Sequence, residues 1–259
     1  MSAQRRIDPL AMAFAGVAEL YDRARLPTED VTVEWALDRF GLGADATVLD
    51  LAAGTGKQSV VLAPRVGRLI AVEPLAEMRA ILVAHVPDAE ALDGTAEAIP
   101  LDDGAVDAVF VGSAFHWFDG PAALREIHRV LRPGGGLAIL YPHARWANEP
   151  WAEEVRARLD RSPHPATRPA NLPSSGRWRA VFADTELFGP LEAATFPTAP
   201  EMTVEQFQLL VASWSRVAAL PDEPRAALLA DVGAILRGHG VERFTLAAEN
   251  EVYVTRRRP

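Results

Sequence analysis

A glycine-rich turn directly after an apolar run constrains the fold of this chain most strongly. Residues 48–57 read VLDLAAGTGK, in which the run ends and a turn containing Gly54 and Gly56 begins. A buried strand followed by such a turn brings its backbone close to a nucleotide-like ligand, because a Cβ would block the turn and the next helix begins with free N–H groups. The leading hypothesis is therefore a site for a small-molecule cofactor.

Three later segments extend the pattern. The apolar run 68–72 ends at Glu73, about 20 residues after the turn, where a doubly wound fold places an acid that binds ribose hydroxyls. The run 106–111 opens into GSAFHWFD, and residues 124–136, LREIHRVLRPGGG, predict an amphipathic helix that Pro and Gly end. A strand at 137–140 follows.

The alternation of these segments predicts the fold class. Strands are expected at 47–51, 69–72, 90–92, 105–111 and 137–141, with helices between them. Near-continuous apolar strands separated by helices indicate a parallel sheet that is covered on both faces. A chain of 259 residues with 49% hydrophobic residues can bury a full core. We expect a single α/β domain, 1–259, with a doubly wound, mostly parallel sheet.

Prolines interrupt the chain after Tyr141 and predict an inserted segment. We expect a core at about 30–142 and 224–259, and a helical lid or substrate insertion at about 143–223 together with an N-terminal helix at 7–26. The proline-rich stretch 161–174 is the expected moving part of this lid. Two runs, 243–248 and 252–256, predict a closing hairpin joined by Asn250 and its neighbours.

Charge and cysteine content exclude several classes of partner. The net charge of −9 opposes binding to nucleic acid or to an anionic membrane, since both require a basic surface. With no cysteine there is neither a disulfide framework nor a thiolate metal site, and we predict no metal. We find no signal peptide and no membrane span, and we expect a soluble cytoplasmic protein. The oligomeric state is left open.

The glycine-rich turn at 54–57 has two other possible interpretations. A phosphate-binding P-loop needs Ser or Thr after the Lys and a glycine five places before the second Gly, but Gln58 follows Lys57 and Leu51 stands five places before Gly56. A dinucleotide fingerprint fits better, because Ser59 can take the third glycine position and Glu73 is correctly placed. An NAD-linked oxidoreductase therefore stays an alternative from the residues alone.

At this point the sequence resembles the class I S-adenosylmethionine-dependent methyltransferases, in particular their small-molecule, methyltransferase type 11-like branch. The resemblance is carried by VLDLAAGTGK (48–57), AVEP (71–74), GTAEAIP (94–100), FHWF (115–118) and RVLRPGG (129–135), and by YDRAR (21–25) near the N-terminus. It implies a Rossmann-like, seven-stranded sheet that ends in an antiparallel hairpin, with S-adenosyl-L-methionine as the cofactor. The implied activity is methyl transfer to a small organic acceptor, with O-, N-, C- and carboxylate methylation all open.

The resemblance also implies a set of cofactor-binding residues. They are Asp50, Ala52, Ala53 and Gly54 at the methionine and ribose part, Glu73 and Pro74 at the ribose, Thr95, Ala96 and Glu97 at the adenine, and Ser113, Ala114 and Phe115 after the next strand. Asp50 is expected to organise the loop or to meet the ammonium group. Glu97 is equally expected to be an exposed loop carboxylate.

Two of these positions depart from the family. Ala52 stands where the family usually has Gly, and the extra methyl is tolerable only if the backbone there avoids positive φ, so the path of the loop at this position is left open. Thr95 stands where Asp is frequent, so its hydrogen bond to the adenine amino group is expected to be weaker.

The catalytic candidates are His116, Tyr21 and His143. Methyl transfer from a sulfonium requires mainly alignment and exclusion of water. His116 is either a general base or, the favoured interpretation, an aromatic wall beside the sulfonium. Tyr21, with Arg23 and Arg25, can close over the cofactor carboxylate, and His143 can take a proton from a hydroxyl acceptor.

The acceptor itself is left open by the sequence. Four tryptophans in or near the insertion suit an apolar or planar acceptor, although packing is the commoner use of Trp: Trp146, Trp151, Trp178 and Trp214. A relative that binds the cofactor without methylating, cyclase-like or regulatory, is the second hypothesis.

Overall fold

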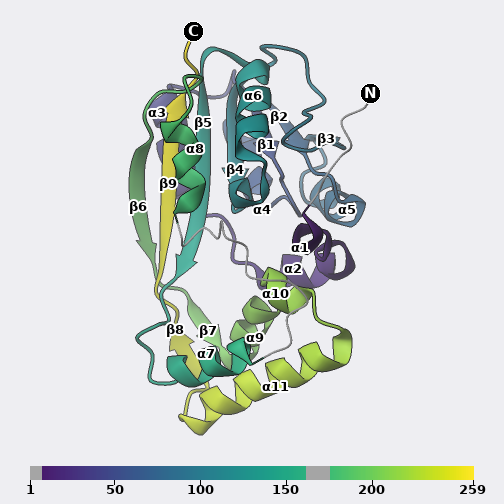
Figure 1. Ribbon diagram of the computed structural model, residues 1–259, viewed down its shortest axis with the longest axis vertical. Coiled ribbons are helices and arrows are strands. Elements are labelled where there is room, and N and C mark those ends of the chain that lie inside the picture. Colours follow the sequence, from purple (N-terminus) through teal and green to yellow (C-terminus); the bar gives the residue numbers. More distant parts are fainter. Residues whose placement is uncertain (1–7, 162–175) are drawn as a thin grey trace.

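The computed structural model describes residues 8–161 and 176–259, and they form two stacked bodies (Figure 1). The sheet body contains a seven-stranded sheet in the order β3-β2-β1-β4-β5-β9-β6. Its strands are β1 (Thr47–Leu51), β2 (Arg68–Val72), β3 (Glu90–Leu92), β4 (Val106–Gly112), β5 (Leu131–Ala144), β6 (Glu192–Thr198) and β9 (Ala248–Arg256). The predicted α/β class and mostly parallel sheet are confirmed.

The direction of the strands places their polar loops together. Strands β1 to β5 pair in parallel, whereas β9 runs antiparallel to both β5 and β6. The carboxyl ends of β1, β2 and β4 therefore meet at one edge of the sheet, where open α/β sheets bind ligands. The loops after these strands carry most of the predicted site.

The prediction of a closing antiparallel pair assigned the wrong strands to it. Residues 243–248 do not pair with 252–256; Asn250 lies inside β9, opposite Phe196 of β6. The antiparallel pair is β6 and β9, and residues 199–247 are inserted between them. β6 escaped prediction because it is an edge strand with mostly exposed side chains and contains Pro197, which an edge strand tolerates.

Helices cover both faces of the sheet and bury alternate side chains of each strand. On one face, α3 (Asp30–Phe40) and α4 (Lys57–Leu62) pack against Val48, Ala108 and Ala138. On the other, α6 (Gly120–Val130) and α8 (Ala180–Ala183) pack against Leu49, Leu137 and other strand residues of the opposite parity. The helix α5 (Ala76–His85) contacts α4 and β3. Successive side chains of each strand thus point to opposite faces and are buried on both, as in a sheet that helices cover on both sides.

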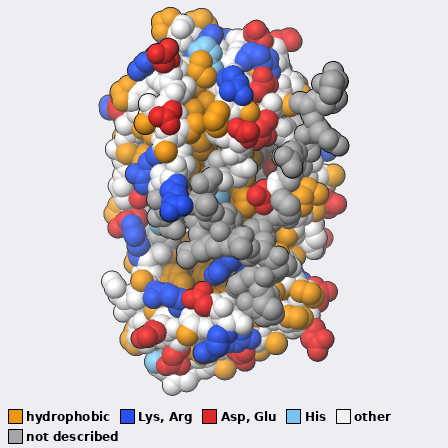
Figure 2. Space-filling view, in the orientation of Figure 1, with side chains coloured by type: hydrophobic (Ala, Val, Ile, Leu, Met, Phe, Trp, Pro, Cys, Tyr) orange, Lys and Arg blue, Asp and Glu red, His pale blue; other side chains and the backbone are white. Residues whose placement is uncertain are grey.

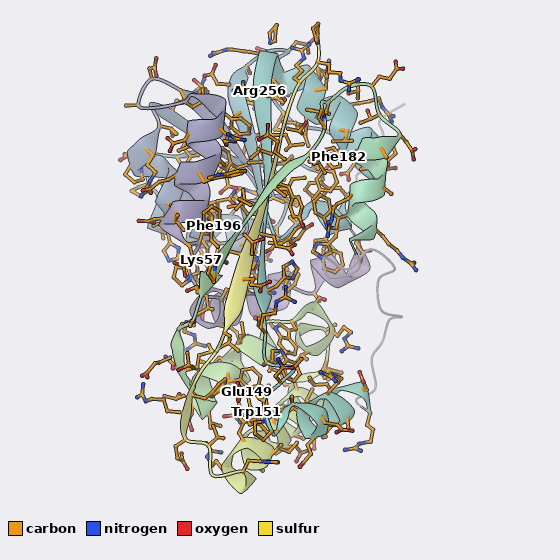
Figure 3. All side chains as sticks on the ribbon, turned by 90° about the vertical axis from the view of Figure 1, so that its left-hand side faces the viewer. Lys57, Glu149, Trp151, Phe182, Phe196 and Arg256 are labelled. Atoms are coloured by element: carbon orange, nitrogen blue, oxygen red, sulfur yellow. The ribbon has the colours of Figure 1, made fainter. Side chains whose placement is uncertain are left out.

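The second body, which we call the helical body, has its own apolar core. It consists of α7 (Ala152–Asp160), β7 (Glu201–Thr203), α9 (Val204–Ala212), α10 (Ser215–Ala218), α11 (Asp222–Gly238) and β8 (Arg243–Thr245). Trp151 lies at its centre, 1% exposed and in contact with Phe207 and Phe244, whereas Phe182 lies in the sheet body (Figure 3).

The predicted boundaries of the insertion therefore need correction. The helix α11 and strand β8, expected in the core at 224–259, belong to the helical body, where α11 contacts α7 and α9. Conversely, α8 and β6, expected in the insertion at 143–223, belong to the sheet body. Amphipathic periodicity predicts a buried face on a helix but does not say against which body it packs.

The N-terminal segment links the two bodies. In place of one helix at 7–26 it forms α1 (Pro9–Met12), a short 3-10 turn and α2 (Ala18–Ala24). Helix α2 contacts α5 of the sheet body and α9 of the helical body. Nearly all of the expected moving stretch 161–174 lies outside the described residues.

Acidic and basic side chains are mixed on the face seen in Figure 2. Among the residues that the structure describes, no helix combines the length and the apolar character needed to cross a membrane.

The close approach of α3 to β5 generates a stability prediction. A Cβ at Gly136 would overlap the ring of Phe40, which packs edge-on against Phe110. We expect Gly136→Ala to lower the free energy of unfolding by about 1–3 kcal/mol, the usual cost of overpacking. Chemical denaturation measures this, with Gly43→Ala, where no atom lies within 4 Å of the added Cβ, as the control. Equal stability of the two variants would contradict the packing argument.

Candidate active site

Two adjoining cavities, of about 300 and 580 Å³, open at the carboxyl edge of the sheet. The smaller cavity lies over the ends of β1, β2 and β4, and the larger one extends toward the helical body. They share a wall of residues from the N-terminal segment, the strand ends and α10: Tyr21, Arg25, Ala52, Gly54, Gly112, Ser113, Tyr141, Pro142, Trp214 and Ser215. A ligand in one cavity can therefore contact a ligand in the other.

Asp50 organises the loop after β1. Its side chain is fully buried, and its two oxygens accept hydrogen bonds from Gln58 Nε2 at 2.8 Å and Ser59 Oγ at 2.6 Å. Burial raises the pKa of Asp50 to about 6, although both hydrogen bonds act in the opposite direction. Of the two predicted roles, the geometry fits the organisation of the loop, because both oxygens face α4.

The condition under which an extra methyl at position 52 is easily tolerated, a backbone that avoids positive φ, is not met. Ala52 has φ of 57°, in the left-handed region that favours glycine, and Gly54 and Gly56 have φ of 58° and 85°. The loop therefore needs three left-handed residues, one of which carries a Cβ. Ser113, after β4, is another non-glycine residue at positive φ, with φ of 55°. Both strained residues line both cavities.

Glu73 joins the ends of β1 and β2 at the smaller cavity. Its Oε2 accepts a hydrogen bond from the backbone N–H of Gly54, and its Oε1 accepts one from Leu75, both at 2.9 Å. Burial raises the pKa of Glu73, while the two backbone donors lower it. Each oxygen keeps a lone pair for a further donor. Pro74 lines the same cavity.

The loop 94–97 forms another wall of the smaller cavity. Thr95 and Ala96 are buried there, and Ala98 N–H donates to Thr95 O at 3.2 Å. Glu97 lines the cavity and also accepts a hydrogen bond from the backbone of Asp119 at 2.9 Å. Because Asp119 caps α6, Glu97 connects this loop to the beginning of that helix.

The N-terminal segment is tied to the glycine turn. Asp22 of α2 lies 3.0 Å from Lys57 Nζ and 3.4 Å from His85 Nε2, and the other nitrogen of His85 lies 3.0 Å from the carbonyl of Thr55. Beside this link, Tyr21 lines both cavities. The ion pair with Lys57 and the contact with His85 thus hold α2 over the loop that follows β1.

Arg25 is a half-buried cationic group at the junction of the cavities. Its guanidinium lies 5.1 Å from the centre of the Tyr21 ring and donates to Ser213 O at 3.4 Å. Its Nε is buried without a hydrogen-bond partner, and no carboxylate among the described residues pairs with it. An anionic ligand group would satisfy this donor. Arg23, for which the sequence predicted the same role, is exposed and lines neither cavity.

His116 and Tyr141 form a hydrogen-bonded pair at the smaller cavity. The Tyr141 hydroxyl accepts from the backbone N–H of His116 at 3.0 Å and lies 3.3 Å from His116 Nδ1. Burial, with a smaller effect of Arg25, lowers the pKa of His116 to about 3, and burial raises the pKa of Tyr141. The Tyr141 proton has Nδ1 as its acceptor, so His116 is neutral and carries its proton on Nε2. This geometry fits a wall or a hydrogen-bond donor better than a general base.

The remaining predicted residues divide between cavity and core. Ser113 and Ala114 line the smaller cavity and Ala53 the larger, but Phe115 lines neither. Phe115 is 2% exposed and packs against Phe118, Trp178 and Phe182, so its side chain belongs to the core and not to the wall of either cavity. It begins a 3-10 turn that directs its ring into the core.

His143 lines the larger cavity, and its hydrogen-bond partner was not predicted from the sequence. Its Nε2 is 3.1 Å from the carboxylate of Glu251 on β9, which lines the same cavity. Trp146 and Trp214 also line this cavity, whereas Trp151 and Trp178 are buried in the two cores. The polar, half-buried residues 249–251 within an otherwise apolar strand were the signal that could have pointed to Glu251.

The chain is similar in sequence to known methyltransferases. A family model described as a methyltransferase domain matches residues 49–139. An uncharacterized methyltransferase from Mycobacterium tuberculosis is 38% identical over 173 residues, which cover 67% of this chain and 68% of that protein. A methyltransferase-like protein from Schizosaccharomyces pombe is 33% identical over 218 residues, 84% of this chain and 83% of that one. This chain is a class I S-adenosylmethionine-dependent methyltransferase.

Solved structures share the fold of this methyltransferase. The YcgJ protein from Bacillus subtilis has a TM-score of 0.58 at 18% identity and covers 89% of this chain and 100% of its own. The cyclase SpnF has a TM-score of 0.58 at 17% identity and covers 96% and 95%. At these identities the likeness shows the fold alone. The family, and not the fold, identifies the enzyme.

The left-handed Ala52 generates a prediction about the loop of the methyltransferase. We expect Ala52→Val to lower the free energy of unfolding by about 1–3 kcal/mol, because a β-branched residue at positive φ is strained. Ala52→Gly is the control at the same position and should stay within about 1 kcal/mol of the parent, since the relieved strain offsets the added chain entropy. Urea denaturation of the three proteins measures both effects. Equal losses in both variants would argue against the left-handed loop.

The half-buried His116 predicts a pH dependence of stability. Its pKa is lowered from 6.5 to about 3 on folding, so below pH 6.5 the unfolded chain binds a proton that the folded protein does not. Each pH unit in this window costs the folded state about 1.4 kcal/mol. Between pH 7 and pH 5 we expect the parent to lose about 2 kcal/mol relative to His116→Gln. Denaturation at both pH values measures this, and a parent-to-variant difference independent of pH would contradict it.

Proposed function

We propose that the methyltransferase holds S-adenosylmethionine in the smaller cavity and methylates a small organic acceptor bound in the larger one. The observation that carries this proposal is Glu73, a buried carboxylate at the end of β2 that lines the smaller cavity beside Ala52 and Gly54. An acid at this position of an open α/β sheet binds ribose hydroxyls. Both cavities are of a size and composition usual for small-molecule sites.

The residues around the smaller cavity fit the separate parts of the cofactor. Glu73 is suited to accept from both ribose hydroxyls, and the loop Thr95–Glu97 is suited to flank the adenine. The unpartnered Nε of Arg25 and the nearby Tyr21 suit the carboxylate of the methionine part. Each part of the ligand thus has a polar group of complementary chemistry.

The cofactor, when bound, supplies the methyl group as a sulfonium substituent. The protein's own contribution is to align the acceptor with this group and to exclude water. The N-terminal helix α2, held by Asp22 to Lys57, covers the glycine turn, and the neutral His116 can donate a hydrogen bond from Nε2 into the smaller cavity. Neither Asp22 and Lys57 nor His116 has to gain or lose a proton in these roles.

The names of more distant relatives do not define the acceptor. One relative is a 2-phytyl-1,4-naphtoquinone methyltransferase and another a malonyl-acyl-carrier-protein O-methyltransferase, and these cover 49% and 36% of this chain. Their matches lie in a part of the chain, and the acceptors differ widely. The larger cavity, with Trp146 and Trp214 in its wall, favours an acceptor with an apolar or planar body.

The proposal is tested by calorimetric titration with S-adenosylhomocysteine. We expect the parent to bind it, and Glu73→Ala to weaken binding by about 1–3 kcal/mol, the cost of leaving buried donors unpaired. Glu77→Ala, on the exposed side of α5, is the control and should bind as the parent does. NADH is titrated in parallel. Binding of NADH without binding of S-adenosylhomocysteine by the folded parent would refute the proposed cofactor.

A further inference from the structure

The end of the β5–β9 ladder brings His143 and Glu251 together. In the register of the two strands, Tyr141 stands opposite Glu251 and His143 opposite Glu249, so His143 and Glu251 are diagonal neighbours. Both lie on the sheet face that carries Tyr141 and Tyr253 in the core, because side chains two positions apart share a face. The distance between His143 Nε2 and Glu251 Oε2 is 3.1 Å.

The protons of this pair can be assigned from the hydrogen bonds. Glu251 Oε2 also accepts from the hydroxyl of Tyr253 at 2.7 Å, so the carboxylate serves as acceptor in both contacts. The proton of the His143 ring then lies on Nε2, directed at Glu251. Its Nδ1 has no hydrogen-bond partner among the described residues and keeps a free lone pair. This is the arrangement of a carboxylate that orients a histidine as a base.

The two histidines of the site differ in this respect. His116 Nδ1 is engaged by the hydroxyl of Tyr141, which also lines both cavities. The rings of His116, Tyr141 and His143 follow one another, with centroids 5.8 and 6.1 Å apart. His143 is therefore one aromatic ring away from His116, but on the side of the larger cavity and with a carboxylate in place of a phenol.

We propose that Glu251 orients His143 as the general base of the methyltransferase, and that the acceptor is a hydroxyl compound bound in the larger cavity. The inference rests on the proposed function, since it takes the larger cavity as the acceptor site. The acceptor O–H bond breaks and its proton passes to His143 Nδ1, while the oxygen forms the new bond to the methyl carbon. The electron pair of the broken carbon–sulfur bond stays on the sulfur, so charge and atoms balance.

The surroundings of the pair favour a planar hydroxyl compound. Trp146 and Trp214, which line the cavity, are stacked with centroids 6.0 Å apart, and Arg156 lies 5.8 Å from the centre of the Trp146 ring. Aromatic walls suit a phenol, whose hydroxyl must lose its proton to become a strong nucleophile. Phenols are accordingly the first acceptors to test.

The first experiment reads the proton on His143 directly. In the ¹⁵N-histidine-labelled protein, nuclear magnetic resonance distinguishes the two tautomers of the ring, and His143→Gln assigns its signals by their loss. We expect the proton on Nε2 in the parent and a mixture of tautomers in Glu251→Gln. A proton on Nδ1 in the parent would overturn the proposal, because the ring would then have no lone pair to offer. An unchanged tautomer in Glu251→Gln would overturn the orienting role of Glu251.

The second experiment measures methyl transfer from labelled S-adenosylmethionine to a panel of phenols, aliphatic alcohols, amines and carboxylates. We expect turnover of phenols, a fall in kcat of about 100-fold or more in His143→Gln, and a fall of at least about tenfold in Glu251→Gln. His239→Gln and Glu154→Gln are matched controls, because these residues form a histidine–glutamate pair at 2.9 Å that lines neither cavity. Both controls should keep the parent's kcat within twofold.

Binding of S-adenosylhomocysteine separates the two levels of failure. We expect all four variants to bind it within twofold of the parent. If the folded parent does not bind it, the proposed function fails. If the parent binds it but methylates only amines or carboxylates, or if His143→Gln keeps the parent's rate with phenols, the inference about His143 and Glu251 is overturned and the proposed function stands.

Discussion

The buried carboxylate of Asp50 is the interaction on which the rest of the site depends. Removing a carboxylate from water costs several kcal/mol unless hydrogen bonds replace the solvent. Here both replacements, from Gln58 and Ser59, come from α4, so the end of β1 and the beginning of α4 are held at one distance. The pKa of about 6 indicates that the hydrogen bonds offset the cost of burial only in part. The link is therefore maintained at the expense of stability, as is usual for groups that shape a site.

The short loop between β1 and α4 has to adapt to this fixed distance. It does so with left-handed residues at positions 52, 54 and 56, and these turn the backbone N–H of Gly54 toward Glu73. Glu73 in turn binds the backbone of Leu75 and so joins the ends of two neighbouring strands. Asp50 thus fixes the loop from beneath through α4, and Glu73 binds its backbone at the cavity. The strain at Ala52 follows from the fixed distance that Asp50 imposes, and it allows the backbone N–H of Gly54 to reach Glu73.

The sequence predicted the parallel strands β1, β2, β4 and β5 well because each contains an apolar run that is buried on both faces. It failed where burial is one-sided or where partners are distant. β6 has mostly exposed side chains, and Asn250 within β9 resembled a turn residue although it lies in the ladder opposite Phe196. Phe115 follows a strand end as a ligand-binding residue would, but the local 3-10 turn sends it into the core. Glu251 was missed because its proximity to His143 depends on the register of an antiparallel pair, which no local pattern specifies.

The insertion of residues 199–247 between β6 and β9 explains why the larger cavity is chemically different from the smaller one. Without the helical body, the ends of β5 and β9 would face solvent, where a histidine–carboxylate pair is well hydrated. Leu210 and Trp214 of the helical body, together with Trp146 packed against its core, surround this edge and so lower the local polarity. In such surroundings a hydrogen bond between an imidazole and a carboxylate is stronger, and a lone pair on the other ring nitrogen is less well hydrated than in bulk water. The same insertion therefore gives the His143–Glu251 pair the apolar surroundings that the proposed base requires.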